Sequence, residues 1–276
     1  MLRYARPRVG GPGLALFTHG SFLEEVHQAE LRASGTWSPS AAYYERRWFD
    51  LAVGRRVFGR FDRWFVLTEG EGSDVRAFFG IPGERITVVG LYLTREFLEA
   101  AGAPPRPGPT STRYICSVSR IDRRKNFGAL LEALDGSGYR FVLAGQDRGG
   151  LAEVEAVARR HPGTRWEYLG TIPEAAKVAL IRSADAVVLP SISEGVPTLA
   201  LEALVLGRPV ILAGVCYGPG GPGVLRCSPN SAELRRVLDS LATRPRFPPM
   251  SPQTVEQATD TFLAALGERP RGSGDA

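Results

Sequence analysis

The sequence has 276 residues, which suits one large or two smaller domains, and a hydrophobic content of 43% allows a packed core. No apolar run approaches the roughly 20 residues that span a bilayer, and no hydrophobic signal-peptide core follows the basic start, so we expect neither an integral membrane nor a secreted protein. The net charge of +5 permits an anionic membrane face, nucleic acid or a phosphorylated ligand as partner and selects none. The three cysteines form no Cys-x-x-Cys pair, so we expect no disulfide framework or zinc site, and a cytoplasmic location fits best.

Strands and helices alternate along the first hundred residues, as in a parallel α/β sheet. We predict strands over 13–18, 64–68 and 85–89 and a helix over 69–79. His19 follows the first strand, at the edge where α/β folds place ligands, although a merely polar loop residue is the alternative.

An aromatic and basic segment, Tyr43–Phe65, follows helical spacing, with arginines on the opposite side. This pattern is typical of a helix that rests on an anionic membrane, so a peripheral contact at the inner membrane face is one interpretation. The commoner one is a core helix with a solvated arginine face.

A proline-rich stretch, residues 104–111, reads as a stiff linker between two domains. We predict a first domain over 1–103, a second over 112–249, and a C-terminal helix with a disordered tail over 250–276. For the second domain we expect strands over 113–119, 139–144, 166–169, 186–189 and 209–212, and helices over 127–134, 151–160, 175–183, 198–206 and 232–241.

The most informative stretch runs from the strand at 186–189 into the helix at 198–206. Glu194 lies in the loop before that helix, and Glu202 lies about one turn inside it. A helix N-terminus carries unpaired N–H groups and a partial positive charge, so it welcomes a phosphate, while carboxylates accept hydrogen bonds from sugar hydroxyls. The layout suits a nucleotide sugar, although strand, loop and helix are also ordinary α/β architecture.

The loop after the strand at 113–119 carries Arg120 and Lys125. Since ligands bind outside the carboxyl ends of parallel strands, both cations could converge with the helix at 198–206 on one anion. A departing diphosphate needs its charge neutralised. The sequence holds no Asp-x-Asp metal motif, so we expect two cations and a helix dipole to do this without metal; a solvated basic turn is the alternative.

The second domain resembles the donor-binding domain of glycosyltransferase family 4, a retaining group with the GT-B fold. The resemblance covers about 140 residues, from 113 to the 240s, and its motifs occur in the family's order. They are Ser119-Arg120-x-x-x-x-Lys125-Asn126, Gly145 after its strand, Tyr168-Leu-Gly170, Ala184-Asp185 leading to Pro190-Ser191, and the Glu-x7-Glu signature from Glu194 to Glu202. One departure is Ser119, where the family usually has glycine.

The resemblance implies a role for each matching residue. Arg120 and Lys125 would hold the diphosphate, Glu194 would face the donor sugar as a catalytic residue, and Glu202 would bind the ribose. His19 would be a second catalytic residue, and Ile172 would lie near the base. The remaining donor-binding positions implied are Gly145, Gly195, Val196, Pro197, Thr198 and Leu199.

The first domain resembles only the second half of the family's acceptor domain, and the family's opening strands with their glycine-rich loop are not found. The predicted fold class is therefore α/β and GT-B-like, with two Rossmann-type parallel-sheet domains of which the N-terminal one is incomplete. A sheet with so few strands exposes edges, so completion by a partner subunit or a homo-oligomer is an expectation.

The sequence thus predicts a metal-independent, retaining, hexosyltransferase-like enzyme that moves a sugar from a nucleotide diphosphate to an unknown acceptor. We expect this enzyme to need no cofactor, because the nucleotide diphosphate-sugar serves as its co-substrate. The alternatives are an inactive or partner-dependent nucleotide-sugar-binding subunit and a nucleotide-sugar isomerase. Nucleic acid is not expected as a partner, because the basic residues match no nucleic-acid-binding motif.

Overall fold

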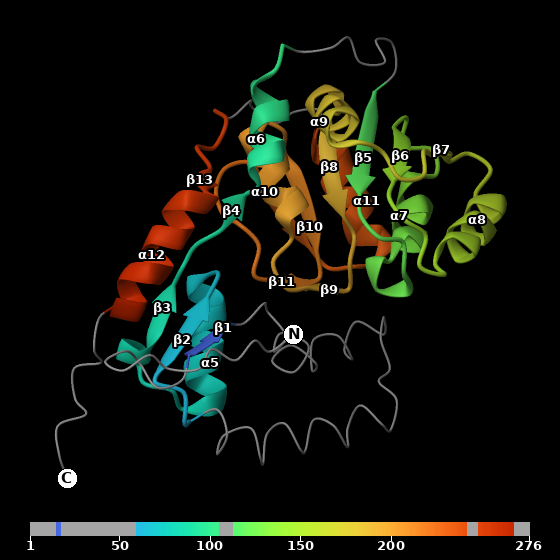
Figure 1. Ribbon diagram of the computed structural model, residues 1–276. Coiled ribbons are helices and arrows are strands. Elements are labelled where there is room, and N and C mark those ends of the chain that lie inside the picture. Colours follow the sequence, from blue (N-terminus) through green and yellow to red (C-terminus); the bar gives the residue numbers. More distant parts are fainter. Residues whose placement is uncertain (1–14, 18–58, 105–112, 242–247, 268–276) are drawn as a thin grey trace. The chain divides into compact units, whose positions relative to one another are not determined.

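The computed structural model describes residues 15–17, 59–104, 113–241 and 248–267, which divide into two compact units (Figure 1). The first unit contains residues 15–17, 59–92 and 253–267. The second contains residues 93–104, 113–241 and 248–252. Each unit has its own parallel sheet, as the α/β prediction requires.

The first unit is built on a three-stranded parallel sheet in the order β1-β2-β3. Trp64 of β2 stacks on Phe79, the last residue of helix α5, and Phe65 on the opposite face of β2 packs against Phe262 of helix α12. Because successive strand residues point to opposite faces, the two helices cover the two sides of β2. The elements are β1 (Ala15–Phe17), β2 (Arg63–Val66), α5 (Glu69–Phe79), η1 (Gly83–Arg85), β3 (Ile86–Val88) and α12 (Val255–Gly267).

Part of the predicted helix Tyr43–Phe65 is wrong. Residues 43–58 lie outside the described residues, but residues 59 and 60 form a turn, 61 and 62 are not helical, and β2 begins at Arg63. Phe61 is 2% exposed and meets Trp64 edge-on, with ring centroids 6.2 Å apart. Phe61, Trp64 and Phe65 thus belong to the core of the first unit and offer no surface to a membrane, whereas residues 43–58 of the predicted segment lie outside the described residues.

The second unit contains a six-stranded parallel sheet in the order β12-β10-β8-β5-β6-β7. In chain order, β5, β6 and β7 follow one another outward on one side of the sheet, and β8, β10 and β12 then follow one another outward on the other side. This is the doubly wound arrangement, and its order reverses between β5 and β8. The strands are β5 (Tyr114–Val118), β6 (Arg140–Ala144), β7 (Arg165–Tyr168), β8 (Ala186–Leu189), β10 (Val210–Ala213) and β12 (Val224–Cys227).

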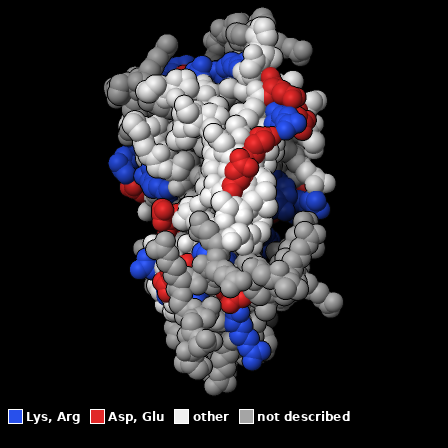
Figure 2. Space-filling model, turned by 60° about the vertical axis from the view of Figure 1, so that its left-hand side comes forward, with Lys and Arg blue, Asp and Glu red and all other residues white. Residues whose placement is uncertain are grey.

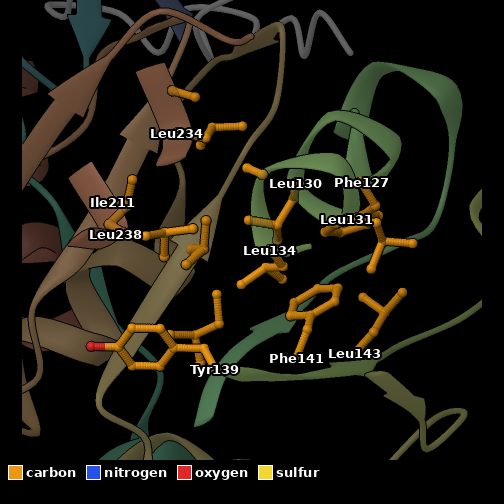
Figure 3. Packing of buried hydrophobic residues seen from close by; sticks show 14 of the residues in the cluster. Phe127, Leu130, Leu131, Leu134, Tyr139, Phe141, Leu143, Ile211, Leu234 and Leu238 are labelled. Atoms are coloured by element: carbon orange, nitrogen blue, oxygen red, sulfur yellow. The ribbon is translucent and has the colours of Figure 1, made fainter. Parts of the chain in front are cut away.

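Helices cover both faces of this sheet. Figure 3 shows α7 and α11 packed on one face, through residues such as Leu130, Leu131 and Leu234 against Phe141 and Ile211. On the other face, α9 and α10 pack against the alternate strand residues. The helices are α6 (Arg95–Gly102), η2 (Arg123–Lys125), α7 (Phe127–Leu134), α8 (Leu151–Arg160), α9 (Glu174–Ser183), α10 (Thr198–Val205) and α11 (Ser231–Ser240).

The boundary between the units falls at 92/93, whereas the sequence suggested 103. The intervening helix α6, which the sequence analysis missed, packs in the second unit: Phe97 is fully buried there, and Arg182 of α9 donates to the carbonyls of Ala101 and Ala103. At the other end, residues 253–267, predicted to be a separate C-terminal segment, pack with the first unit.

Short strands that lack a hydrophobic run also escaped prediction. They are β4 (Tyr92–Leu93), which pairs with β13 (Gln253–Thr254), and β9 (Ser193–Glu194), which pairs with β11 (Val215–Cys216). No helix among the described residues is both long and apolar enough to cross a membrane. The predicted disordered tail from residue 268 lies outside the described residues.

Candidate functional site

The candidate site lies where the strand order of the second sheet reverses. Neighbouring strands β5 and β8 lead away from each other in the chain, and the carboxyl edge at such a reversal is where doubly wound sheets bind ligands. The segment between β5 and α7 contains Arg120 and, at the end of η2, Lys125; the segment between β8 and α10 contains Glu194, in the short strand β9. The sequence predicted these residue types at strand ends, and the sheet order brings the two loops together.

Asn126 fixes both loops. It adopts the left-handed conformation, with φ at 55°, and its side-chain amide donates to the carbonyl of Pro190 at 3.0 Å and to that of Pro229 at 2.9 Å. The N–H of Ile192 donates to the carbonyl of Arg124 at 2.9 Å. One asparagine therefore ties the loop after β5 to the loops that follow β8 and β12.

Lys125 and Glu194 form an ion pair across these loops. Their side chains are 10% and 12% exposed, so the pair is almost withdrawn from water. The hydroxyl of Ser191, itself buried, donates to the same Glu194 oxygen at 2.6 Å. The predicted diphosphate cation and the predicted sugar-facing carboxylate thus neutralise each other in the structure, and a ligand would have to share them.

Gly145, at the end of β6, closes the site from the β6 side. Its φ is 131°, and a side-chain carbon there would lie 1.8 Å from the carbonyl oxygen of Ser119. Only glycine fits this approach of two backbones. The side chain of Ser119, the departure from the family pattern, is not part of this approach, and its hydroxyl donates to the carbonyl of Arg120 at 3.1 Å.

The N-terminus of α10 points to the same edge. Pro197 precedes the helix, and no side chain hydrogen bond caps this end in the described structure. Gly195 and Val196 are half-buried and Thr198 is exposed, so the backbone amides are reachable. Leu199 is different, because its side chain packs in the core between α10 and the sheet and can offer only its backbone N–H.

Glu202, one turn further along α10, accepts a hydrogen bond from Lys177 of α9 at 2.9 Å. The same ammonium lies 2.6 Å from Glu174. Burial raises the pKa of Glu202 above its ordinary value, and the hydrogen bond and charge of Lys177 offset part of this. Burial alone would lower the pKa of Lys177, but the two carboxylates outweigh it and the pKa is raised.

Of the remaining predicted site residues, those that the structure describes make no side-chain hydrogen bond or ion pair that ties them to the site. Arg120 is exposed at the start of its loop, and Ile172 is half-buried after β7, packed against the core under α9 and α10. His19 lies outside the described residues. Within the described ranges no group of three or more histidine, cysteine, aspartate or glutamate side chains is arranged to hold a metal ion.

Sequence reasoning missed Lys177 and the hydroxyl of Ser191. A signal for Lys177 was present, because only two of the 34 basic residues in the chain are lysines and the other is Lys125. Each lysine pairs with one glutamate of the Glu-x7-Glu signature. In a chain that otherwise uses arginine, the two lysines are therefore candidates for functional residues, and both lie opposite carboxylates of the site.

On the face drawn in Figure 2, the charged side chains of the described residues do not form one large patch of a single sign. Acidic and basic side chains of the described residues alternate there over the white, uncharged background. This face gives no support to a large basic surface for nucleic acid or an anionic membrane.

The sequence model of a family described as "Glycosyl transferases group 1" matches residues 105–221. Among curated proteins, the D-inositol 3-phosphate glycosyltransferases of Mycobacterium tuberculosis and Mycobacterium bovis are 30% identical over 171 residues. The match covers 58% of this chain, and the chain spans 36% of the length of those relatives.

Solved structures resemble the chain over more of its length. Sucrose-phosphate synthase from Thermosynechococcus elongatus gives a TM-score of 0.61 at 19% identity, covering 91% of this chain and 63% of the other. HepE of Anabaena, solved with UDP and glucose, gives 0.57 at 17% identity, covering 92% and 65%. These similarities confirm the predicted α/β, GT-B-like fold class.

Proposed function

Because the family model of the group 1 glycosyl transferases matches residues 105–221, we propose that the protein transfers a sugar from a nucleoside-diphosphate sugar to an acceptor. The observation that carries the proposal is the meeting of Lys125, Glu194 and the N-terminus of α10 at the reversal of strand order. This is the place where a doubly wound sheet binds nucleotides.

The donor would lie across the two loops. Its diphosphate would meet Lys125, Arg120 and the backbone amides at the start of α10, which together supply positive charge for a leaving group with about two negative charges. Glu194 would face the sugar, and Glu202 would accept hydrogen bonds from the ribose hydroxyls. The ion pair between Lys125 and Glu194 holds both side chains in place before the donor arrives.

We further propose that the reaction retains the anomeric configuration and uses these cations in place of a metal. Double displacement needs a nucleophilic carboxylate beside the anomeric carbon. Glu194 is already engaged by Lys125 and Ser191, which favours attack from the same face, assisted by the departing phosphate. Under this proposal the protein would also belong to glycosyltransferase family 4, its donor would carry a hexose, and His19 would orient the acceptor or the sugar.

The curated relatives suggest one class of acceptor to try first. Their name gives D-inositol 3-phosphate, a phosphorylated cyclitol, as the molecule they glycosylate. We propose polyol phosphates, glycans and lipid-linked sugars as the acceptor panel, in that order.

The test is product analysis with radiolabelled nucleotide sugars, with and without the acceptor panel and with a chelator present. Transfer to an acceptor, with retention seen by proton NMR of the product, is the expected result. Conversion of the donor sugar without an acceptor would identify an isomerase, and donor binding with no product would identify a binding subunit. Loss of transfer in chelator would contradict metal independence.

A further inference from the structure

Lys177 has a position that the proposed function does not explain. It lies on α9, outside both loops of the site, yet its ammonium sits between the carboxylates of Glu174 and Glu202. The ammonium is also 5.4 Å from the centroid of the Phe97 ring, which belongs to α6 and is fully buried. Three side chains from three helices therefore surround one charge.

An ammonium suits this place better than the guanidinium that the chain uses elsewhere. It is a compact charge with three donors, so it can serve two carboxylates that approach from different helices. A guanidinium is a planar fork that prefers two bonds to one carboxylate. This chemical difference gives a reason for a lysine in a chain whose basic residues are arginine at all but two positions.

We propose that Lys177 is a positioning residue that holds Glu202 ionised and in the orientation that recognises the donor ribose. The inference deepens the proposed function and rests on it, since the role of Glu202 comes from there. Lys177 itself touches no part of the donor in this account. It acts through the hydrogen bond to Glu202.

The surroundings of Glu202 explain why it needs a partner. Its side chain is 11% exposed, and a carboxylate at such a depth loses most of its hydration. The charged groups that face it are Lys177 and Glu174, both from α9, and Glu174 opposes its ionisation. Lys177 is therefore the counter-charge to Glu202 among the described residues.

A purely structural ion pair is the other interpretation, and it makes different predictions. A buried pair contributes little net stability, while removal of one partner leaves the other charge unpaired. If the ion pair only supported the packing of α9 on α10, its removal would lower the affinity for every nucleotide equally and at every pH. If Lys177 positions Glu202, its removal would lower the affinity only for nucleotides that carry ribose hydroxyls, and this effect would diminish as pH rises.

The variants are Lys177→Met, which keeps the length of the stem but not the charge, and Lys177→Gln, which is uncharged but polar and serves if the first does not fold. Lys177→Arg keeps the charge. Glu174→Gln is the matched control, because it removes the other ion pair of Lys177 and leaves the bond to Glu202.

Two measurements are made on each full-length variant. The first is a carbon-13 NMR titration of the Glu202 carboxyl, assigned by its absence in Glu202→Gln, which needs no nucleotide. The second is the affinity for nucleoside diphosphates with a ribose and with a 2′,3′-dideoxyribose, from pH 6 to 9.

In Lys177→Met we expect a higher pKa for Glu202, about tenfold weaker ribonucleotide binding at pH 7 that recovers toward pH 9, and at most about a twofold change for the dideoxynucleotide. Lys177→Arg should restore the pKa, and Glu174→Gln should bind like the wild type. If Lys177→Met binds both nucleotides equally more weakly at all pH values, or if the pKa of Glu202 is unchanged, the positioning role of Lys177 is overturned while the proposed function stands. Wild-type protein that binds neither nucleotide overturns the proposed function as well.

Discussion

Lys125 and Glu194 are 69 positions apart in the sequence and form an ion pair at the reversal of strand order. Because both side chains are nearly withdrawn from water, removal of either leaves an uncompensated charge. We expect Lys125→Met and Glu194→Gln each to lower the free energy of unfolding by about 3 kcal/mol, and the double variant to lower it by clearly less than the sum. Urea denaturation of the four proteins measures this coupling. Additive losses would show that the pair does not interact.

Gly145 is predicted to tolerate no side chain. A methyl group there would meet the Ser119 carbonyl and the backbone would keep a φ of 131°, so Gly145→Ala should cost about 3 kcal/mol or more. Gly138→Ala is the matched control, since its φ is 80° and no atom lies within 4 Å of the added carbon. The control should lose only about 1–2 kcal/mol in the same denaturation experiment. Equal losses at both positions would disprove the close backbone approach at the site.

Asn126 joins three loops through two donated hydrogen bonds. In Asn126→Asp a carboxylate would face the carbonyls of Pro190 and Pro229, so we expect a loss of about 2–3 kcal/mol at pH 7. The half-buried carboxylate would face two carbonyl oxygens and so have a raised pKa, and the variant should regain stability as pH falls. Asn126→Gly, which keeps the left-handed backbone and loses both bonds, should lose less and show no such pH dependence. Thermal unfolding at pH 5 and pH 7 distinguishes the two.

Tyr114 and Cys116 make β5 sensitive to alkali. Burial raises the pKa of each to about 12, from ordinary values of 10.0 and 9.0. The folded state therefore holds these protons more tightly than the unfolded state, and stability should fall as pH rises from about 9 to 12. Cys116→Val removes one of these groups, so its stability should fall less steeply over that range. Denaturation midpoints at pH 8 and 10.5 test this, and equal declines in both proteins would contradict it.

Cysteine labelling gives a second consequence of the same burial. Cys116 is 0% exposed, so an alkylating reagent should modify it only after unfolding. Cys216 and Cys227 are both half-buried, but burial raises the pKa of Cys227 to about 11, so Cys216 should react first in the native protein. Mass spectrometry of peptides after brief alkylation measures the order, and early modification of Cys116 would show that β5 opens to solvent in the native state.

The sequence was most informative where local chemistry decides the structure. Helix α5 begins and ends as predicted, because Thr68 caps its start and Gly80 ends it in the left-handed conformation. Helices α7 and α8 also match their predicted bounds, since the apolar spacing is set by the face that each buries.

Other elements depend on tertiary contacts that no local pattern records. Strand β9 contains Glu194 and exists because it pairs with β11, and β12 follows a glycine- and proline-rich stretch that hid its apolar residues. Helix α6 is held by Arg182, far along the chain. The site residues could be named from their motifs, but the pairing of each glutamate with a lysine required the strand order and the packing of α9 on α10.

The measurement that tests the central claim most directly is calorimetric titration of the full-length protein with UDP-, GDP-, ADP- and dTDP-sugars, beside Glu202→Ala. The account predicts that one nucleotide binds the wild type and that the variant loses most of this affinity while remaining folded. No binding by folded wild-type protein, or equal binding by the variant, would contradict a nucleotide-sugar site at the reversal between β5 and β8.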